Sequence, residues 1–128
     1  MRSIDIEKHT EFWKSSSDED LEVALQLLDS GKIRHGLFFL HLSLEKILKA
    51  CVCHKTRDMA PRTHNLVRLA DLLDVPFEQD QRWFLADMNP YNLEGRYPQA
   101  INPLPDKTEV ERLVENARST IQWLKKKL

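Results

Sequence analysis

The chain has 128 residues and a mass of 15.1 kDa, which suits one domain with a real hydrophobic core and is too little for two. Hydrophobic residues make up 41% and charged residues 30%, and the formal net charge is −1, so the composition excludes a disordered chain and a global basic field for nucleic acid. Leucine is commoner than valine and isoleucine together, and there are three glycines, which excludes a turn-rich all-β fold.

The chain shows neither the pattern of a signal peptide nor a long apolar run. Charged residues are spread through the first 20 positions, with no apolar segment among them. The longest mostly apolar stretch, residues 36–44, is too short to cross a bilayer. We therefore expect a cytoplasmic protein that makes no contact with a membrane.

A first helical segment covers about residues 5–30. Apolar residues recur at helical spacing in its second half, and Ser17 followed by three acidic residues is typical of a helix start. The pattern leaves open whether residues 5–30 form one long helix or two nearly continuous ones. Gly31 directly after the segment predicts its end.

A second segment, about residues 33–54, carries two apolar stripes and therefore predicts a central helix that is covered from more than one side. One stripe consists of Ile33, Leu37, Leu40, Leu44, Ile47 and Cys51. The other contains His41 and Glu45 one turn apart among apolar residues. Because a buried polar group needs a partner, these two residues form either a satisfied structural pair or part of a ligand-binding site.

A metal site is suggested by Cys51 and Cys53, which are followed by His54. A zinc site needs about four converging ligands, and the sequence has no second cysteine pair to complete one. On a helix, the two thiols would also point in diverging directions. We expect buried, reduced cysteines, with no metal and no cofactor.

Three further elements follow the second segment. Thr63 is expected to cap a short helix that reaches about Leu73, and another helix is expected over residues 78–88. Residues 89–105 contain four prolines and predict a long irregular segment. Asp106 and Glu109 resemble a capping box that opens the last helix. Together the elements predict an all-α fold, an up-and-down bundle of four to five helices in a single domain over residues 1–128.

The order of these motifs resembles the HEPN domain family over about residues 10–125. The motifs are Trp13, Asp20-Leu21-x-x-Ala24, Gly31, the run from Phe38 to Ala50, Thr63-His64-Asn65-Leu66, and Tyr91 followed by Arg96-Tyr97-Pro98. The resemblance implies an up-and-down helical bundle that is usually a homodimer. It also implies pairing with a minimal nucleotidyltransferase, in a two-component module of the toxin–antitoxin kind.

Many HEPN proteins are metal-independent endoribonucleases that carry an arginine, four to six residues and then a histidine. Arg57 and His64 match this pattern with six residues between them. In such a reaction the ribose 2′-hydroxyl attacks the adjacent phosphate, a histidine moves protons, and an arginine stabilises the charge on the phosphoryl oxygens. The structural alternative is that His64 only helps to cap the third helix.

Arg96 and Tyr97 supply a further candidate in the irregular segment, because an arginine beside Gly95 and a tyrosine can bind a phosphate or a nucleotide. Equally, Arg96 can pin the segment to an acidic helix face. Two functions therefore stay open. The first is a dimeric binding and assembly module for a nucleotide or RNA, with His41, Glu45, Arg96 and Tyr97 as ligand-binding residues. The second is an endoribonuclease that uses Arg57 and His64.

Overall fold

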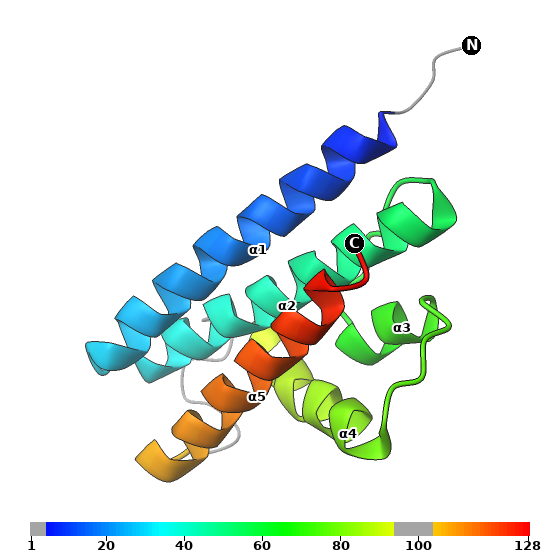
Figure 1. Ribbon diagram of the computed structural model, residues 1–128. Coiled ribbons are helices and arrows are strands. Elements are labelled where there is room, and N and C mark those ends of the chain that lie inside the picture. The colour runs from blue at the N-terminus through cyan, green and yellow to red at the C-terminus, as the bar shows by residue number, and fades with distance from the viewer. Residues whose placement is uncertain (1–4, 94–103) are drawn as a thin grey trace.

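The structure is a computed structural model that describes residues 5–93 and 104–128. The described residues form five α-helices and one 3₁₀-helix, which confirms the predicted all-α fold. The elements are α1 (Ile6–Asp29), α2 (Ile33–Thr56), α3 (Leu66–Asp71), α4 (Gln79–Met88), the 3₁₀-helix η1 (Asn89–Leu93) and α5 (Lys107–Lys125). They make an up-and-down bundle in which α2 lies in the middle, with α1 along one side and α5 across another (Figure 1).

The first segment is one continuous helix, which answers the question that its sequence left open. It begins at Asp5, whose side chain accepts a hydrogen bond from the main-chain N–H of Lys8. Ser17 does not start a helix, because its side chain is buried and donates a hydrogen bond of 2.6 Å to the main-chain carbonyl of Ser43 in α2. A polar residue that looks like a cap is therefore a cross-link between two helices. Gly31, with φ of +81°, directly follows the C-cap residue Ser30, so the first helix ends where the sequence predicts.

The helices α1 and α2 pack closely along their lengths. Gly36 permits this approach at one end, because a Cβ atom added there would lie 2.5 Å from Leu28 Cδ2. Further along, Lys46 of α2 contacts α1 through Asp20 and through the hydroxyl of Ser16, both at 2.7 Å. The other faces of α2 meet α3, η1 and α5, so the expected central position of this helix is confirmed.

The starts of α3 and α5 differ in detail from the predicted caps. Asn65, rather than Thr63, caps α3, because its side chain accepts a hydrogen bond from the main-chain N–H of Arg68. The Thr63 hydroxyl instead accepts a bond from the N–H of Asn65. Asp106 caps α5 as expected, but the Glu109 carboxylate binds Arg112 and does not return to Asp106, so no reciprocal capping box forms.

Both cysteines are free thiols in the core of α2. Burial raises the pKa of Cys51 to about 12 and also raises the pKa of Cys53, so both thiols stay protonated at neutral pH. Within residues 5–93 and 104–128, no three His, Cys, Asp or Glu side chains gather as a metal site. None of the helices in this part of the chain combines the length and apolarity that a bilayer-spanning helix needs.

Candidate functional site

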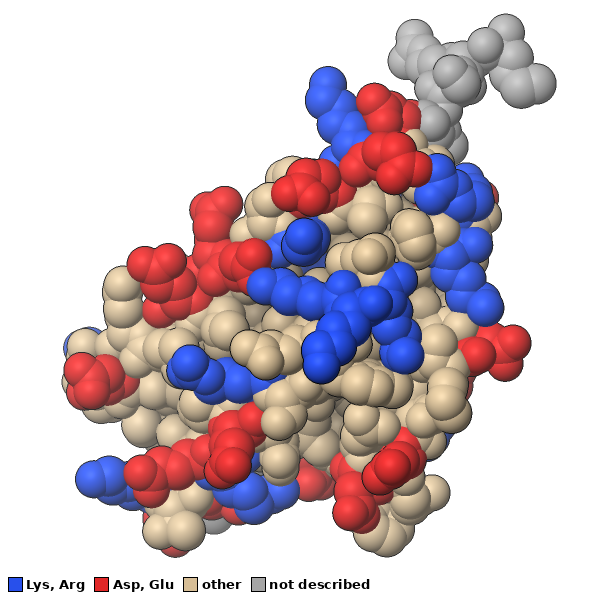
Figure 2. Space-filling model, in the orientation of Figure 1, with Lys and Arg blue, Asp and Glu red and all other residues tan. Residues whose placement is uncertain are grey.

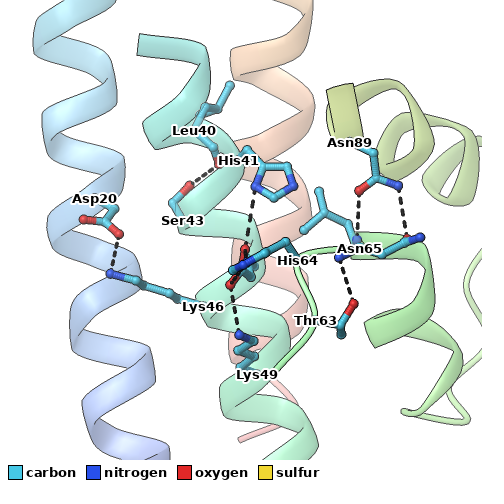
Figure 3. Close-up of polar contacts among 12 residues, drawn as sticks. Asp20, Leu40, His41, Ser43, Lys46, Lys49, Thr63, His64, Asn65 and Asn89 are labelled. Carbon is cyan, nitrogen blue, oxygen red and sulfur yellow. Dashed lines mark hydrogen bonds and ion pairs between the residues drawn. The ribbon is translucent and has the colours of Figure 1, made fainter. Parts of the chain in front are cut away.

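The centre of the candidate site is Glu45, a carboxylate buried on α2. Lys49 lies one turn later on the same helix, and its Nζ atom is 2.9 Å from Glu45 Oε2. From the loop before α3, His64 brings its Nδ1 atom to 3.0 Å from one carboxylate oxygen and 3.1 Å from the other. Lys49 and His64 thus approach the same carboxylate from different elements (Figure 3). A buried carboxylate is tolerated only with such partners, since an unpaired one is very costly.

His41 lies one turn before Glu45, and its ring is fully buried. Its Nδ1 atom is 3.8 Å from Glu45 Oε1, which is too long for a hydrogen bond. Neither ring nitrogen has a hydrogen-bond partner in the described part of the chain. Burial lowers the pKa of His41 to about 4, against the opposing attraction of the Glu45 carboxylate, so the ring is neutral at pH 7. The expected pair of His41 and Glu45 is therefore a contact, while the hydrogen bonds of Glu45 go elsewhere.

The loop that holds His64 is fastened to the start of η1 by two asparagines. The Nδ2 atom of Asn89 donates a bond of 3.1 Å to Asn65 Oδ1, and Asn89 Oδ1 accepts a bond of 2.9 Å from the N–H of Leu66 (Figure 3). His64 comes directly before this fixed point and its side chain is 61% exposed. Because Glu45 holds Nδ1, the Nε2 atom remains available to solvent and to a ligand.

Arg57, the predicted companion of His64, ends α2 in the left-handed conformation, with φ of +58°. Its guanidinium forms an ion pair with Glu7 near the start of α1 and its side chain is 52% exposed. Arg57 and His64 thus have different carboxylate partners, on α1 and on α2. The other predicted ligand-binding residues, Arg96 and Tyr97, lie outside the described residues.

The stretch from the last turn of α2 through the connection to the first turn of α3 is basic, in a chain with a net charge of −1. Residues 54–68 contain a single acidic residue, Asp58, against four exposed basic residues, Lys55, Arg57, Arg62 and Arg68. Figure 2 shows Lys and Arg side chains gathered near the C-terminal ends of α2 and α5. His64 therefore lies within a basic segment that can attract an anion.

Three residues of the site were not among the predicted site residues. Lys49 could have been found, because it follows Glu45 by four residues and such pairs meet on a helix face. Asn65 and Asn89 carry no comparable pattern, because their contact joins positions that are 24 residues apart.

We expect replacement of the buried Glu45 to lower the stability of the fold more than replacement of the exposed His64. Glu45→Ala leaves the buried Lys49 ammonium without its carboxylate and should lower the free energy of unfolding by about 3 kcal/mol. His64→Ala removes a mostly exposed ring and should change it by less than about 1 kcal/mol. Urea denaturation measures both values, with Glu22→Ala on the exposed surface of α1 as the control. Equal effects of Glu45→Ala and Glu22→Ala would contradict the assignment of Glu45 as a buried anchor.

The buried His41 should make the fold sensitive to acid. Its pKa is about 4 when folded and ordinarily 6.5, so between these values the unfolded chain binds more protons than the folded one. The contribution of His41 to the free energy of unfolding is therefore fully present above pH 6.5 and is lost as the pH falls toward 4. The loss is about 3 kcal/mol in total and about 2 kcal/mol at pH 5. Urea denaturation at pH 7.5 and 5.0 checks this, because His41→Gln should lose less stability than the wild type. A loss of the same size in both proteins would contradict the prediction.

The family model of the HEPN domain matches residues 10–128 of the chain. Among solved structures, the chain is similar to TT1696 from Thermus thermophilus, with a TM-score of 0.76, 21% identity, and coverage of 93% of this chain and 98% of that one. It is also similar to ST0689, an archaeal HEPN homologue, with a TM-score of 0.71, 17% identity, and coverage of 98% and 97%. No curated protein matches the chain. The match over nearly the whole length and the shared fold show that the chain belongs to the HEPN domain family.

Proposed function

We propose that this HEPN chain is a single-domain, cytoplasmic binding and assembly module that forms a homodimer and recognises a nucleotide or RNA. The observation that carries the proposal is His64, which Glu45 holds in place and which lies in the basic connection between α2 and α3. An exposed imidazole in a segment that also carries exposed arginines suits contacts to phosphate oxygens. Arg96 and Tyr97 remain proposed ligand-binding residues on the basis of sequence alone.

Two further features support the dimer and the assembly role. Large apolar side chains remain exposed on and beside several helices, among them Phe12 on α1, Leu72 at the end of α3 and Trp83 on α4. A chain of this length that leaves such side chains in water is expected to cover some of them with another protein surface. The HEPN resemblance adds the proposed partner, a nucleotidyltransferase-fold protein in a module of the toxin–antitoxin kind.

The binding role predicts salt-dependent affinity for a polyanion. A fluorescently labelled single-stranded RNA should bind more weakly as salt increases, because bound phosphates release counterions. His64→Ala and Arg62→Ala should each weaken binding roughly ten-fold, the effect of one charge-assisted hydrogen bond, whereas Arg118→Ala on exposed α5 serves as the control. Fluorescence anisotropy measures the affinity, and sedimentation should give about twice 15.1 kDa. A monomer would contradict the proposal. So would RNA affinity that His64→Ala and Arg62→Ala leave unchanged, or that they weaken no more than the control Arg118→Ala does.

A metal-independent endoribonuclease is the second candidate, favoured by the way in which the Glu45 carboxylate holds Nδ1 of His64. This arrangement fixes the tautomer and leaves Nε2 free to act as a general acid or base toward bound RNA. In that reaction Arg57 would leave Glu7 to stabilise the charge that builds on the phosphate.

The nuclease role predicts a loss of RNA cleavage of about 10²–10⁴ for His64→Ala. Arg57→Ala should have a similar effect, the double variant should lose little more, and a chelator should leave the rate unchanged. Glu7→Gln is the matched control, because it removes the partner of Arg57 and retains the arginine. RNA that stays intact with the folded, dimeric wild type between pH 6 and 8 excludes the nuclease role and leaves the binding module.

A further inference from the structure

A groove of about 530 Å³ runs between α4 and α5, away from the Glu45 site. One wall carries Trp83 and Phe84 of α4, and the other carries Trp123 of α5. Trp83 is 61% exposed, the largest exposed fraction among the large apolar residues of the described chain. A tryptophan that is left in water on the wall of a groove is typical of a surface that recognises a ligand or partner.

The groove has an acidic stripe along α4. Asp80, Trp83 and Asp87 follow spacings of three and four residues and so lie on one face of the helix. At one end, Asp87 is 3.6 Å from Nη2 of Arg112, and the Nε and Nη2 atoms of this guanidinium donate to the Glu109 carboxylate. The charge of Arg112 is thus satisfied within the chain. At the other end, the Asp80 carboxylate has no ion pair or hydrogen bond in the described part of the chain.

Two residues that line the groove, Asp87 and Trp123, already contact cations of the chain. Besides the pair of Arg112 with Asp87, the Nζ atom of Lys127 lies 4.5 Å from the centre of the Trp123 ring, in a cation–π contact. Trp83 and Asp80 offer the same two chemical groups, an indole face and a carboxylate one helical turn apart, and neither contacts a cation within residues 5–93 and 104–128.

We propose that Trp83 and Asp80 form a binding site for an arginine side chain of a partner polypeptide. A planar guanidinium can stack on the indole and direct two N–H donors at the carboxylate, which the compact ammonium of lysine cannot do as well. The groove is open along the two helices, and Asn116 and Ser119 on α5 offer an amide and a hydroxyl to the main chain of a bound segment. The site lies on α4, away from His64, so its test is independent of the proposed nucleotide or RNA binding, while it would give the exposed Trp83 an occupant other than the dimer partner.

The test is an NMR titration of the ¹⁵N-labelled protein with the peptide acetyl-Gly-Ser-Arg-Ser-Gly-amide. We expect saturable shifts of the Trp83 indole N–H and of the α4 main-chain amides, at millimolar peptide. The same peptide with citrulline in place of arginine keeps the shape without the charge and should bind at least about five-fold more weakly. Asp80→Asn and Trp83→Leu should each weaken binding about three-fold, as expected for an exposed ion pair and an exposed cation–π contact.

The matched controls lie on α1, where Phe12 is an aromatic residue with 58% exposure and Glu19 is an exposed carboxylate. Phe12→Leu and Glu19→Gln should leave the peptide affinity unchanged. Equal binding of the arginine and citrulline peptides would overturn the proposal, as would unchanged binding by Asp80→Asn and Trp83→Leu. Acetyl-arginine-amide that binds as tightly as the pentapeptide would assign the site to a small cation and overturn the polypeptide partner.

Discussion

The fold around the candidate site depends on the burial of one carboxylate in the middle of the central helix. Glu45 is buried on α2, so water cannot solvate its charge. Lys49 compensates from the same helix, and that contact forms as soon as α2 does. His64 compensates from the loop before α3, and this contact links the buried charge to the path of the chain after α2. Together with the bonds of Asn89 to Asn65 and Leu66, this ion fixes the loop, and it sets the direction in which the exposed imidazole presents its second nitrogen.

The hairpin of α1 and α2 provides the rigid base for this arrangement. Its two helices are joined by polar contacts as well as by apolar packing, through the bond of Ser17 to Ser43 and the contacts of Lys46 with Asp20. Gly36 also lets the two helices approach each other closely, at a point where any larger side chain would meet Leu28. These contacts fix the rotation of α2 about its own axis, and so they fix which face carries His41 and Glu45.

Periodicity in the sequence was sufficient to predict the helices, because apolar residues recur at helical spacing along them, as in the stripe of α2 that includes Leu37 and Leu44. The sequence pattern could not predict the role of Ser17, because a serine before acidic residues looks the same whether it caps a helix or bonds to a neighbouring helix. The cap of α3 was misplaced by two residues, since Thr63 and Asn65 both have side-chain acceptors. Helix ends are decided by local geometry that composition does not specify.

The candidate site was predicted in part for the same physical reason. His41 and Glu45 stood out because polar groups in an apolar stripe need partners, and the structure buries both. The partner of Glu45 from outside α2 is His64 in the loop before α3, 19 residues further along the chain. The bond that ties this loop to the start of η1, from the N–H of Leu66 to Asn89, spans 23 residues. No rule of spacing connects positions that are so far apart. The pairing of Arg57 with Glu7, across 50 residues, was equally out of reach of the sequence.

The order of the elements along the chain also has a consequence during synthesis. The first two helices are neighbours in sequence and pack on each other, so they can form as soon as residue 56 has left the ribosome. The face of α2 that contacts α5 then has no cover, because α5 comprises 19 residues at the far end of the chain. Until those residues emerge, the nascent hairpin exposes core positions of α2 such as Cys51, whose thiol donates to the main-chain carbonyl of Leu124 in α5. The unfinished chain is therefore the form of this protein that most needs a chaperone, and the last helix to be made ends that need.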